Sequence, residues 1–189
     1  IENVWMQHRN EVINGLNSIM MHDLQKAADV ILYAIRSGKT IYTAGNGASA
    51  AIAQHWACDY TKGCSDTGAR PFKPKVISLS ANIPLMTAIS NDISYDEVYS
   101  YQLERLANPG DVFISISSSG NSPSVVRACE VALEKNLSVI ALTGFKGGRT
   151  NELAQYPIHV DVQEYEAVED LQQAIMHMIA KYLRFRKWN

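Results

Sequence analysis

The chain has 189 residues, 47% of them hydrophobic and 19% charged. This is the size and composition of a soluble globular domain, which buries roughly 70% of its unfolded surface. The net charge of −2 argues against nucleic acid as a partner, because a phosphate backbone requires a clustered cationic face. With no apolar run near the ~20 residues of a membrane span and no signal-peptide pattern, we expect no membrane partner. Three cysteines without metal-type spacing (Cys58, Cys64, Cys129) favour a reduced, cytoplasmic compartment.

Residues 4–36 have the pattern of one long amphipathic helix. Apolar side chains recur at three- and four-residue steps from Val4 to Ile35, and Gly38 supplies a helix stop. Such a helix, outside an alternating core, often packs against a neighbouring subunit, although packing on its own sheet is equally consistent with the pattern. We therefore expect a single domain over 1–189. Residues 1–37 form its N-terminal helix and oligomer contact, and residues 40–189 form its core.

After Gly38, apolar strands alternate with helices. Strands are predicted at Thr40–Ala44, Val76–Ser80, Asp111–Ile116, Ser138–Thr143 and Ile158–Val160. Helices are predicted at Ser49–Lys62, Ile83–Ser90, Tyr95–Leu106, Pro123–Lys135, Arg149–Ala154 and Ala167–Phe185. Short apolar strands separated by helices indicate a parallel sheet covered on both faces, and hence an α/β fold. Ligands bind such sheets at the carboxyl ends of the strands.

Two loops at predicted strand ends are rich in glycine and serine. The first, Gly45-Asn46-Gly47, leads into a helix at Ser49, and the second runs from Ser117 to Pro123. Backbone N–H groups and hydroxyls at a helix N-terminus hold anions, so the pair suggests a phosphorylated small molecule. The candidate hydroxyls are Ser49, Ser117, Ser118, Ser119 and Ser122. Alternatively, Ser49 and Ser122 are helix N-caps and the serine triplet is a polar turn.

Neither loop matches a nucleotide-binding signature. The first loop lacks the third glycine of G-x-G-x-x-G, and it also lacks the Gly-Lys-Ser/Thr of a Walker loop. The chain also has no G-x-S-x-G nucleophile elbow. Nicotinamide and nucleotide chemistry are therefore disfavoured.

The helix that follows the first loop contains an imidazole and a carboxylate four residues apart. His55 and Asp59 fall on one helix face, with Cβ atoms about 5–6 Å apart. Such a pair chelates a divalent metal or serves as an acid/base couple. A plain surface or core hydrogen bond is the more common role for this pairing, but the nearby anion loop favours a functional one.

The last predicted helix also contains ionisable side chains. Glu169 and His177 are eight residues apart, about 12 Å along a helix axis, so they meet one small ligand only from its opposite ends or from different subunits. The default interpretation of His177 is a core histidine whose hydrogen bonds are made within the protein. Asn91 and Asp92, after another helix, form a polar pair that caps that helix or contacts a sugar hydroxyl.

Four segments together resemble a known family. They read G-N-G-A-S-A-A-I-A-Q-H-W-A from residue 45, T-A-I-S-N-D from residue 87, G-D-V-F-I-S-I-S-S-S-G-N-S-P-S-V-V from residue 110 and A-L-T-G-F-K-G-G from residue 141. This set is similar to the sugar isomerase (SIS) domain, and within it to the phosphoheptose isomerases. The resemblance runs over nearly the whole chain.

The resemblance implies a fold, an assembly and a reaction. The fold is a three-layer α-β-α sandwich with a five-stranded parallel sheet, and four subunits form a homotetramer with active sites at the interfaces. The reaction interconverts sedoheptulose 7-phosphate and D-glycero-D-manno-heptose 7-phosphate through an enediol. It supplies a heptose precursor of lipopolysaccharide or capsule. A zinc ion is the implied cofactor.

The resemblance also assigns roles to individual residues. It implies substrate contacts by Asn46, Gly47, Ala48 and Ser49, sugar contacts by Asn91 and Asp92, and phosphate contacts by Ser117, Ser118, Ser119 and Ser122. Zinc ligands would be His55, Asp59, Glu169 and His177. Asp59 and His177 would be catalytic, and Asp59 and Glu169 would also contact the substrate.

Two of these positions depart from the family pattern. Asp59 stands where the family has a glutamate, and Glu169 stands where it has a glutamine. The first change shortens the acid by one methylene, and the second adds an anion. The pair of changes is compatible with compensation, a shifted substrate or loss of activity. Compensation is favoured because each position keeps a possible metal ligand.

Other functions stay open at this point. A non-catalytic SIS scaffold of the type that associates with the DnaA replication initiator is one alternative, although such scaffolds lack the catalytic acid. A sugar-phosphate-sensing module and an isomerase of another phosphosugar are the others. Turnover of ketose phosphates separates these possibilities.

Overall fold

A computed structural model describes residues 1–64 and 73–185. Five strands form one parallel sheet in the order β2-β1-β3-β4-β5, confirming the α/β prediction. Their bounds are β1 Thr40–Ala44, β2 Lys75–Ser78, β3 Val112–Ile116, β4 Ser138–Thr143 and β5 Tyr156–His159. Because β2 lies on one side of β1 and β3 on the other, strand order reverses between β1 and β3. The loops after these two strands therefore meet at the switch point, where parallel sheets bind ligands.

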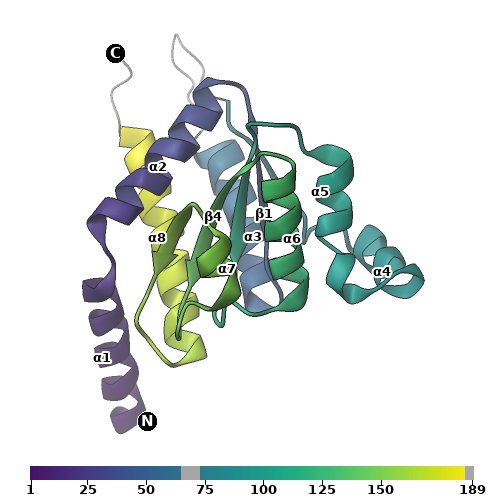
Figure 1. The fold of residues 1–189 in the computed structure, drawn as a ribbon. Helices are drawn as coiled ribbons and strands as arrows, with labels where there is room; N and C mark the ends of the chain where they lie inside the picture. Colours follow the sequence, from purple (N-terminus) through teal and green to yellow (C-terminus); the bar gives the residue numbers. More distant parts are fainter. Residues whose placement is uncertain (65–72, 186–189) are drawn as a thin grey trace.

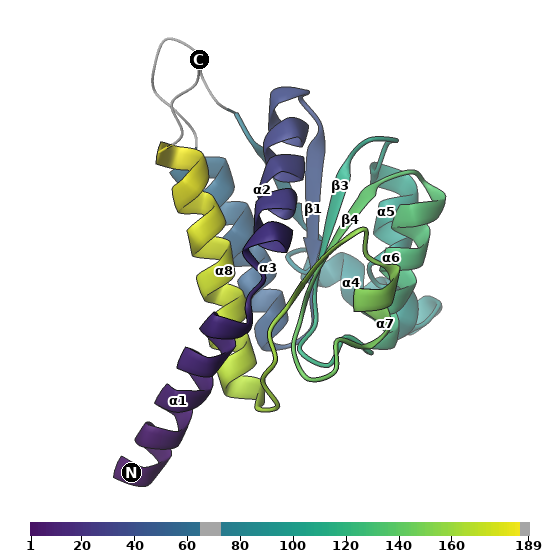
Figure 2. The ribbon, with the colours of Figure 1, turned by 60° about the vertical axis from the view of Figure 1, so that its left-hand side comes forward.

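Helices cover both faces of this sheet. Their bounds are α1 Glu2–Ser18, α2 Met21–Arg36, α3 Ala48–Cys58, α4 Ile83–Asp92, α5 Ser100–Leu106, α6 Pro123–Glu134, α7 Gly148–Leu153 and α8 Tyr165–Phe185. In Figure 2, α2, α3 and α8 lie on one side of the strands and α5, α6 and α7 on the other. The strand side chains alternate to match. Ile41 and Val112 join the cluster under α2, α3 and α8, while Tyr42 and Phe113 join the opposite cluster.

The prediction of one helix over residues 4–36 is wrong. The backbone is extended at Ile19 (φ −67°, ψ 120°) and at Met20 (φ −76°, ψ 112°), which separates α1 from α2. The hydroxyl of Ser18 donates to the Gly15 carbonyl and accepts from the Asp161 N–H, joining the end of α1 to the segment before α8. The change of direction lets α1 extend beyond the sheet, as Figure 1 shows.

Two other predicted helices are interrupted. The one expected at Ser49–Lys62 is α-helical to Cys58 and continues as a π-helix over Asp59–Gly63. The one expected at Tyr95–Leu106 consists of a 3₁₀ turn, Tyr95–Glu97, followed by α5. The π-helix over Asp59–Gly63 is of interest because such segments are frequent at functional sites. The remaining predicted helices and strands match the observed ones to within two residues.

The second serine loop is packed tightly against the turn before α7. The Gly144 N–H donates to the Ser118 carbonyl and the Thr150 N–H to the Gly120 carbonyl, both at 2.9 Å. Gly120 has φ +66°, and a Cβ on it would lie 1.8 Å from the Gly147 carbonyl oxygen. Glycine is therefore required here, and the loop conformation is fixed by its neighbour.

Candidate active site

The two glycine/serine loops share one pocket at the switch point. It has a volume of about 130 Å³ and brings together side chains from the ends of β1 and β3 and from the start of α8. Its lining comprises Asn46, Ser49, Ile116, Ser117, Ser118, Ser119, Ser122, Tyr165 and Glu169. All five predicted phosphate-site serines are thus in a single cavity.

The serine hydroxyls of this pocket do not cap their helices. The N-cap of α3 is Gly47 rather than Ser49, and Ser122 at the N-cap of α6 makes no side-chain capping bond. Instead, the hydroxyls of Ser117 and Ser122 lie 3.5 Å apart across the pocket. Side-chain capping is therefore not the role of these serines, although Ser117 and Ser119 also accept the N–H bonds of Gly120 and Asn121, as the polar-turn interpretation predicts. The N-termini of α3 and α6, which follow β1 and β3, add positive dipole ends at the edge formed by the carboxyl ends of the strands.

Two tyrosines hold the first loop in place. The Tyr99 hydroxyl donates to the Gly45 carbonyl oxygen at 2.6 Å and lies 2.9 Å from Asn46 Oδ1, which also accepts from the Tyr95 hydroxyl at 2.9 Å. The amide nitrogen of Asn46 donates to Ser124 Oγ at 3.1 Å. Burial raises the pKa of Tyr99 to about 12, so its hydroxyl remains a donor at neutral pH. Neither tyrosine could be linked to this loop from the sequence, since nothing in the pattern connects Tyr95 or Tyr99 to residue 46.

A second group of side chains lies between α3 and α8. His55 Nε2 is 3.2 Å from Asp59 Oδ1, and His177 Nε2 is 3.6 Å from Asp59 Oδ2. One donor atom from each of these residues can be chosen so that all three lie within 4.8 Å of one another. Two imidazoles and a carboxylate are a donor set that binds zinc and leaves one position open, so these residues fit a divalent metal.

Packing of two buried aromatic rings aligns α3 with α8. Trp56 and Tyr60 stack with ring centroids 5.0 Å apart, and both are fully buried. The Tyr60 hydroxyl donates to the Met176 carbonyl at 3.4 Å, directly before His177 in α8. The contact places the face that carries His55 and Asp59 opposite His177.

Glu169 lies in the serine pocket rather than in this three-residue group. Burial raises its pKa, and the negative charges of Glu166 and Asp170 raise it further. The carboxyl group is therefore more easily protonated than an exposed glutamate. The side chain that does contact the group is Gln173, one helical turn further along α8.

The pocket and the three-residue group are adjacent. Ser49 and His55 are six residues apart on α3, about 9 Å along the axis, and Glu169 and Gln173 are about 6 Å apart on α8. Both helices therefore run from the pocket to the group. A ligand whose phosphate occupies the pocket could present its other end to Asp59.

Comparison with known proteins identifies the family. Residues 5–144 match the SIS domain. The chain belongs to the SIS domain family. The phosphoheptose isomerase of Aliarcobacter butzleri is 35% identical over 173 residues, 92% of this chain and 90% of that protein. A probable phosphoheptose isomerase of Thermoplasma acidophilum is 40% identical over 152 residues, 80% of this chain and 82% of that protein.

Solved structures agree with this assignment. The phosphoheptose isomerase GmhA from Neisseria gonorrhoeae superimposes with a TM-score of 0.86 at 29% identity, covering 96% of this chain and 97% of that one. Within the SIS domain family, the chain therefore belongs to the phosphoheptose isomerase branch and is an isomerase.

Besides Asp59, four predicted contact residues lie outside the pocket lining. Gly47 and Ala48 are exposed at the start of α3 in this SIS domain. Asn91 and Asp92 are at the end of α4, which Figure 1 shows projecting from the sheet, and the Asn91 amide donates to the Asp92 carboxylate at 2.7 Å. Their contacts with a substrate stay predictions.

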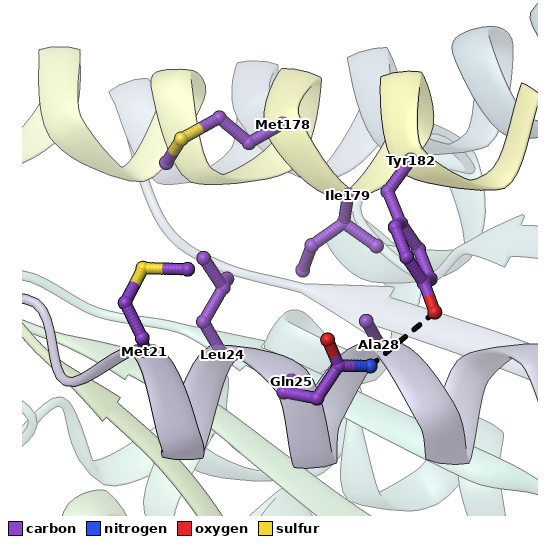
Figure 3. Close-up of a pocket in the computed structure, with 7 residues that line it drawn as sticks. All are labelled: Met21, Leu24, Gln25, Ala28, Met178, Ile179 and Tyr182. Atoms are coloured by element: carbon purple, nitrogen blue, oxygen red, sulfur yellow. Dashed lines mark hydrogen bonds between the residues drawn. The ribbon is translucent and has the colours of Figure 1, made fainter. Parts of the chain in front are cut away.

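A further cavity of about 200 Å³ lies between α2 and α8 (Figure 3). It is lined mainly by apolar side chains, including Met21, Leu24 and Ile179, with one hydrogen bond from the Gln25 amide to the Tyr182 hydroxyl at 3.3 Å. None of the residues that line this cavity has a carboxylate or an imidazole.

Proposed function

We propose that the chain converts sedoheptulose 7-phosphate to D-glycero-D-manno-heptose 7-phosphate. The observation that carries this proposal is the position of Asp59, whose carboxylate oxygens lie 3.2 and 3.6 Å from two imidazoles beside a serine-lined pocket. The pocket holds the phosphate, and the acid and imidazoles act on the far end of the sugar. The names of the relatives supply the choice of a seven-carbon sugar.

The reaction is a proton transfer between two carbons. Asp59 removes a proton from C1 of the ketose while the C2 carbonyl oxygen takes up a proton, which gives the enediol. The proton on Asp59 exchanges with solvent, Asp59 then delivers a proton to C2, and the C1 hydroxyl loses its own proton to form the aldehyde. His177 gives and receives the protons on oxygen, since imidazole exchanges protons near neutral pH.

His55, Asp59 and His177 would hold a zinc ion, which when bound would polarise the oxygens on C1 and C2. Glu169 is the proposed fourth ligand and a proposed substrate contact; it lines the serine pocket and is not one of the three grouped residues His55, Asp59 and His177. Phosphate binding by the serine loops contributes positioning, because binding energy remote from the reacting carbons aligns them with Asp59.

Exposed apolar side chains support a homotetramer with active sites at its interfaces. Val4, Trp5, Ile13 and Leu16 on α1 are 64%, 63%, 47% and 43% exposed. Apolar exposure of this extent on a projecting helix marks an interaction surface.

Residues 1–189 are proposed to form one domain, since both apolar clusters pack on the same sheet.

A cytoplasmic location is proposed from the cysteines. Cys58, Cys64 and Cys129 are all free thiols, as a reducing compartment would keep them. Among the described residues, no helix is both long and apolar enough to cross a membrane.

Turnover of sedoheptulose 7-phosphate by purified protein tests the proposed reaction. Asp59→Ala and His177→Ala should each lower kcat by about 10²-fold or more, the usual contribution of a general acid or base. Gln25→Met, on α2 and away from Asp59, is the control and should keep wild-type activity. Full activity in either active-site variant would refute the assigned roles. Absence of turnover by the wild type would refute the reaction.

A further inference from the structure

Two adjacent glutamines on α8 have different surroundings. Gln172 is fully buried, and its amide donates to the Leu142 carbonyl of β4 at 3.0 Å. Gln173 is half-buried and faces α3 instead, with its amide nitrogen 2.7 Å from His55 Nδ1 and 3.1 Å from His177 Nε2. One carboxamide therefore bridges both imidazoles.

The hydrogen-bond roles in this bridge follow from Asp59. An ionised carboxylate only accepts, so His55 Nε2, 3.2 Å from Asp59 Oδ1, must be the donor of that pair. In a neutral imidazole the other nitrogen is an acceptor, so His55 Nδ1 accepts from Gln173. This reasoning assigns the amide nitrogen, rather than the amide oxygen, to the side that faces His55.

The same amide group determines the state of His177. A carboxamide nitrogen has two N–H donors, and the second one is directed at His177 Nε2. His177 then accepts at Nε2 and carries its proton on Nδ1. The two imidazoles then hold opposite tautomers, and the partner of the His177 Nε2 lone pair is Gln173 rather than the Asp59 carboxylate, which lies 3.6 Å away.

We propose that Gln173 is a positioning residue of the active site, which orients the His55 and His177 rings and determines which nitrogen of each carries the proton. The rings are perpendicular, with an interplanar angle of 82° and centroids 5.1 Å apart, and the carboxamide spans the gap between them. Its contribution to catalysis rests on the proposed function, because the Gln173 N–H keeps His177 Nε2 unprotonated, and a substrate hydroxyl that displaces this N–H then meets a basic nitrogen.

Histidine ¹⁵N NMR tests the positioning without any turnover. Spectra are recorded on metal-free protein at about pH 8.5, above the ordinary histidine pKa of about 6.5. The wild type should show His55 protonated on Nε2 and His177 on Nδ1. Gln173→Met keeps length and helix propensity but removes both donors, so both rings should become tautomer mixtures. Gln173→Glu replaces the donors by acceptors and should move the His55 proton to Nδ1. Gln25→Met is the matched control and should reproduce the wild-type spectrum.

Kinetics on sedoheptulose 7-phosphate provide the second readout. Loss of an outer hydrogen-bond partner typically costs 10–100-fold in activity, so Gln173→Met should lower kcat by at least about 10-fold. KM should change by less than about twofold, because the serine pocket is untouched. Identical tautomers in the wild type and Gln173→Met would overturn the proposal, as would an unchanged kcat. If the wild type turned over no heptose phosphate while the tautomers still responded to Gln173→Met, the reaction would be refuted and the positioning upheld.

Discussion

The carboxylate of Asp59 has one oxygen 3.2 Å from His55 Nε2 and the other 3.6 Å from His177 Nε2. The four-residue spacing of His55 and Asp59 predicted that they share a helix face, and this proximity confirms it. His177 could not be placed from sequence, because its approach depends on the packing of α8 against α3. Gln173 was missed for the same reason, since a glutamine on an amphipathic helix carries no signal of its own.

Restoring the family's longer acid at position 59 tests whether the site is built around aspartate. In Asp59→Glu the added methylene should displace the carboxylate by about 1 Å from its present position between the two imidazoles, and misplacement of that size can cost 10²-fold in rate. We expect kcat to fall by one to two orders of magnitude with little change in KM, measured by steady-state kinetics. A higher kcat in Asp59→Glu than in the wild type would show instead that aspartate is the less effective acid at this position.

The strands were predicted more accurately than the helices. Buried parallel strands are short apolar runs bounded by polar turns, so their limits are visible in the sequence. The break between α1 and α2 was missed because Ile19 and Met20 continue the apolar pattern while their backbone is extended. The π-helix at Asp59 likewise has no periodicity that distinguishes it from the preceding α-helix.

The serine loop depends on glycine at position 120. Gly120→Ala combines a positive φ with a Cβ 1.8 Å from the Gly147 carbonyl oxygen, whereas Gly38→Ala has a similar φ of +67° and open space around its Cβ. We expect Gly38→Ala to cost about 1 kcal/mol, from backbone strain alone. Gly120→Ala should cost clearly more and should raise KM, because the phosphate loop must shift. Urea unfolding measures the loss in free energy of unfolding, and steady-state kinetics measure KM. Equal losses in Gly120→Ala and Gly38→Ala would show that the loop relieves the contact with the Gly147 carbonyl oxygen without cost.

The whole molecule should lose stability at alkaline pH. Burial raises the pKa of Cys64 to about 11 and those of Tyr99 and Cys129 to about 12. Above about pH 8.5 for the thiols and about pH 10 for the tyrosine, the unfolded chain releases these protons while the folded chain keeps them, so the free energy of unfolding falls as pH rises. Urea unfolding at about pH 8 and pH 10.5 measures this loss. Cys129→Ala should flatten the dependence, and an unchanged slope would show that this thiol does not contribute.

The proposed assembly depends on the exposed apolar side chains of α1. If α1 forms a subunit interface, Trp5→Lys should lower the molar mass measured by sedimentation, since it places a charge among side chains such as Val4 and Leu16. Gln7→Lys adds the same charge to an exposed polar position of α1 and is the control. A wild-type monomer, or an unchanged tetramer in Trp5→Lys, would remove α1 from the interface.

Conversion of sedoheptulose 7-phosphate in deuterated water, followed by mass spectrometry of the aldose formed, tests the central claim most directly. Carbon-to-carbon proton transfer through Asp59 exposes the proton to solvent, so the wild type should place deuterium at C2. Asp59→Asn, of the same size but unable to act as a base, should form product at least about 10²-fold more slowly. Product free of deuterium from the wild type, or an undiminished rate in Asp59→Asn, would contradict the account.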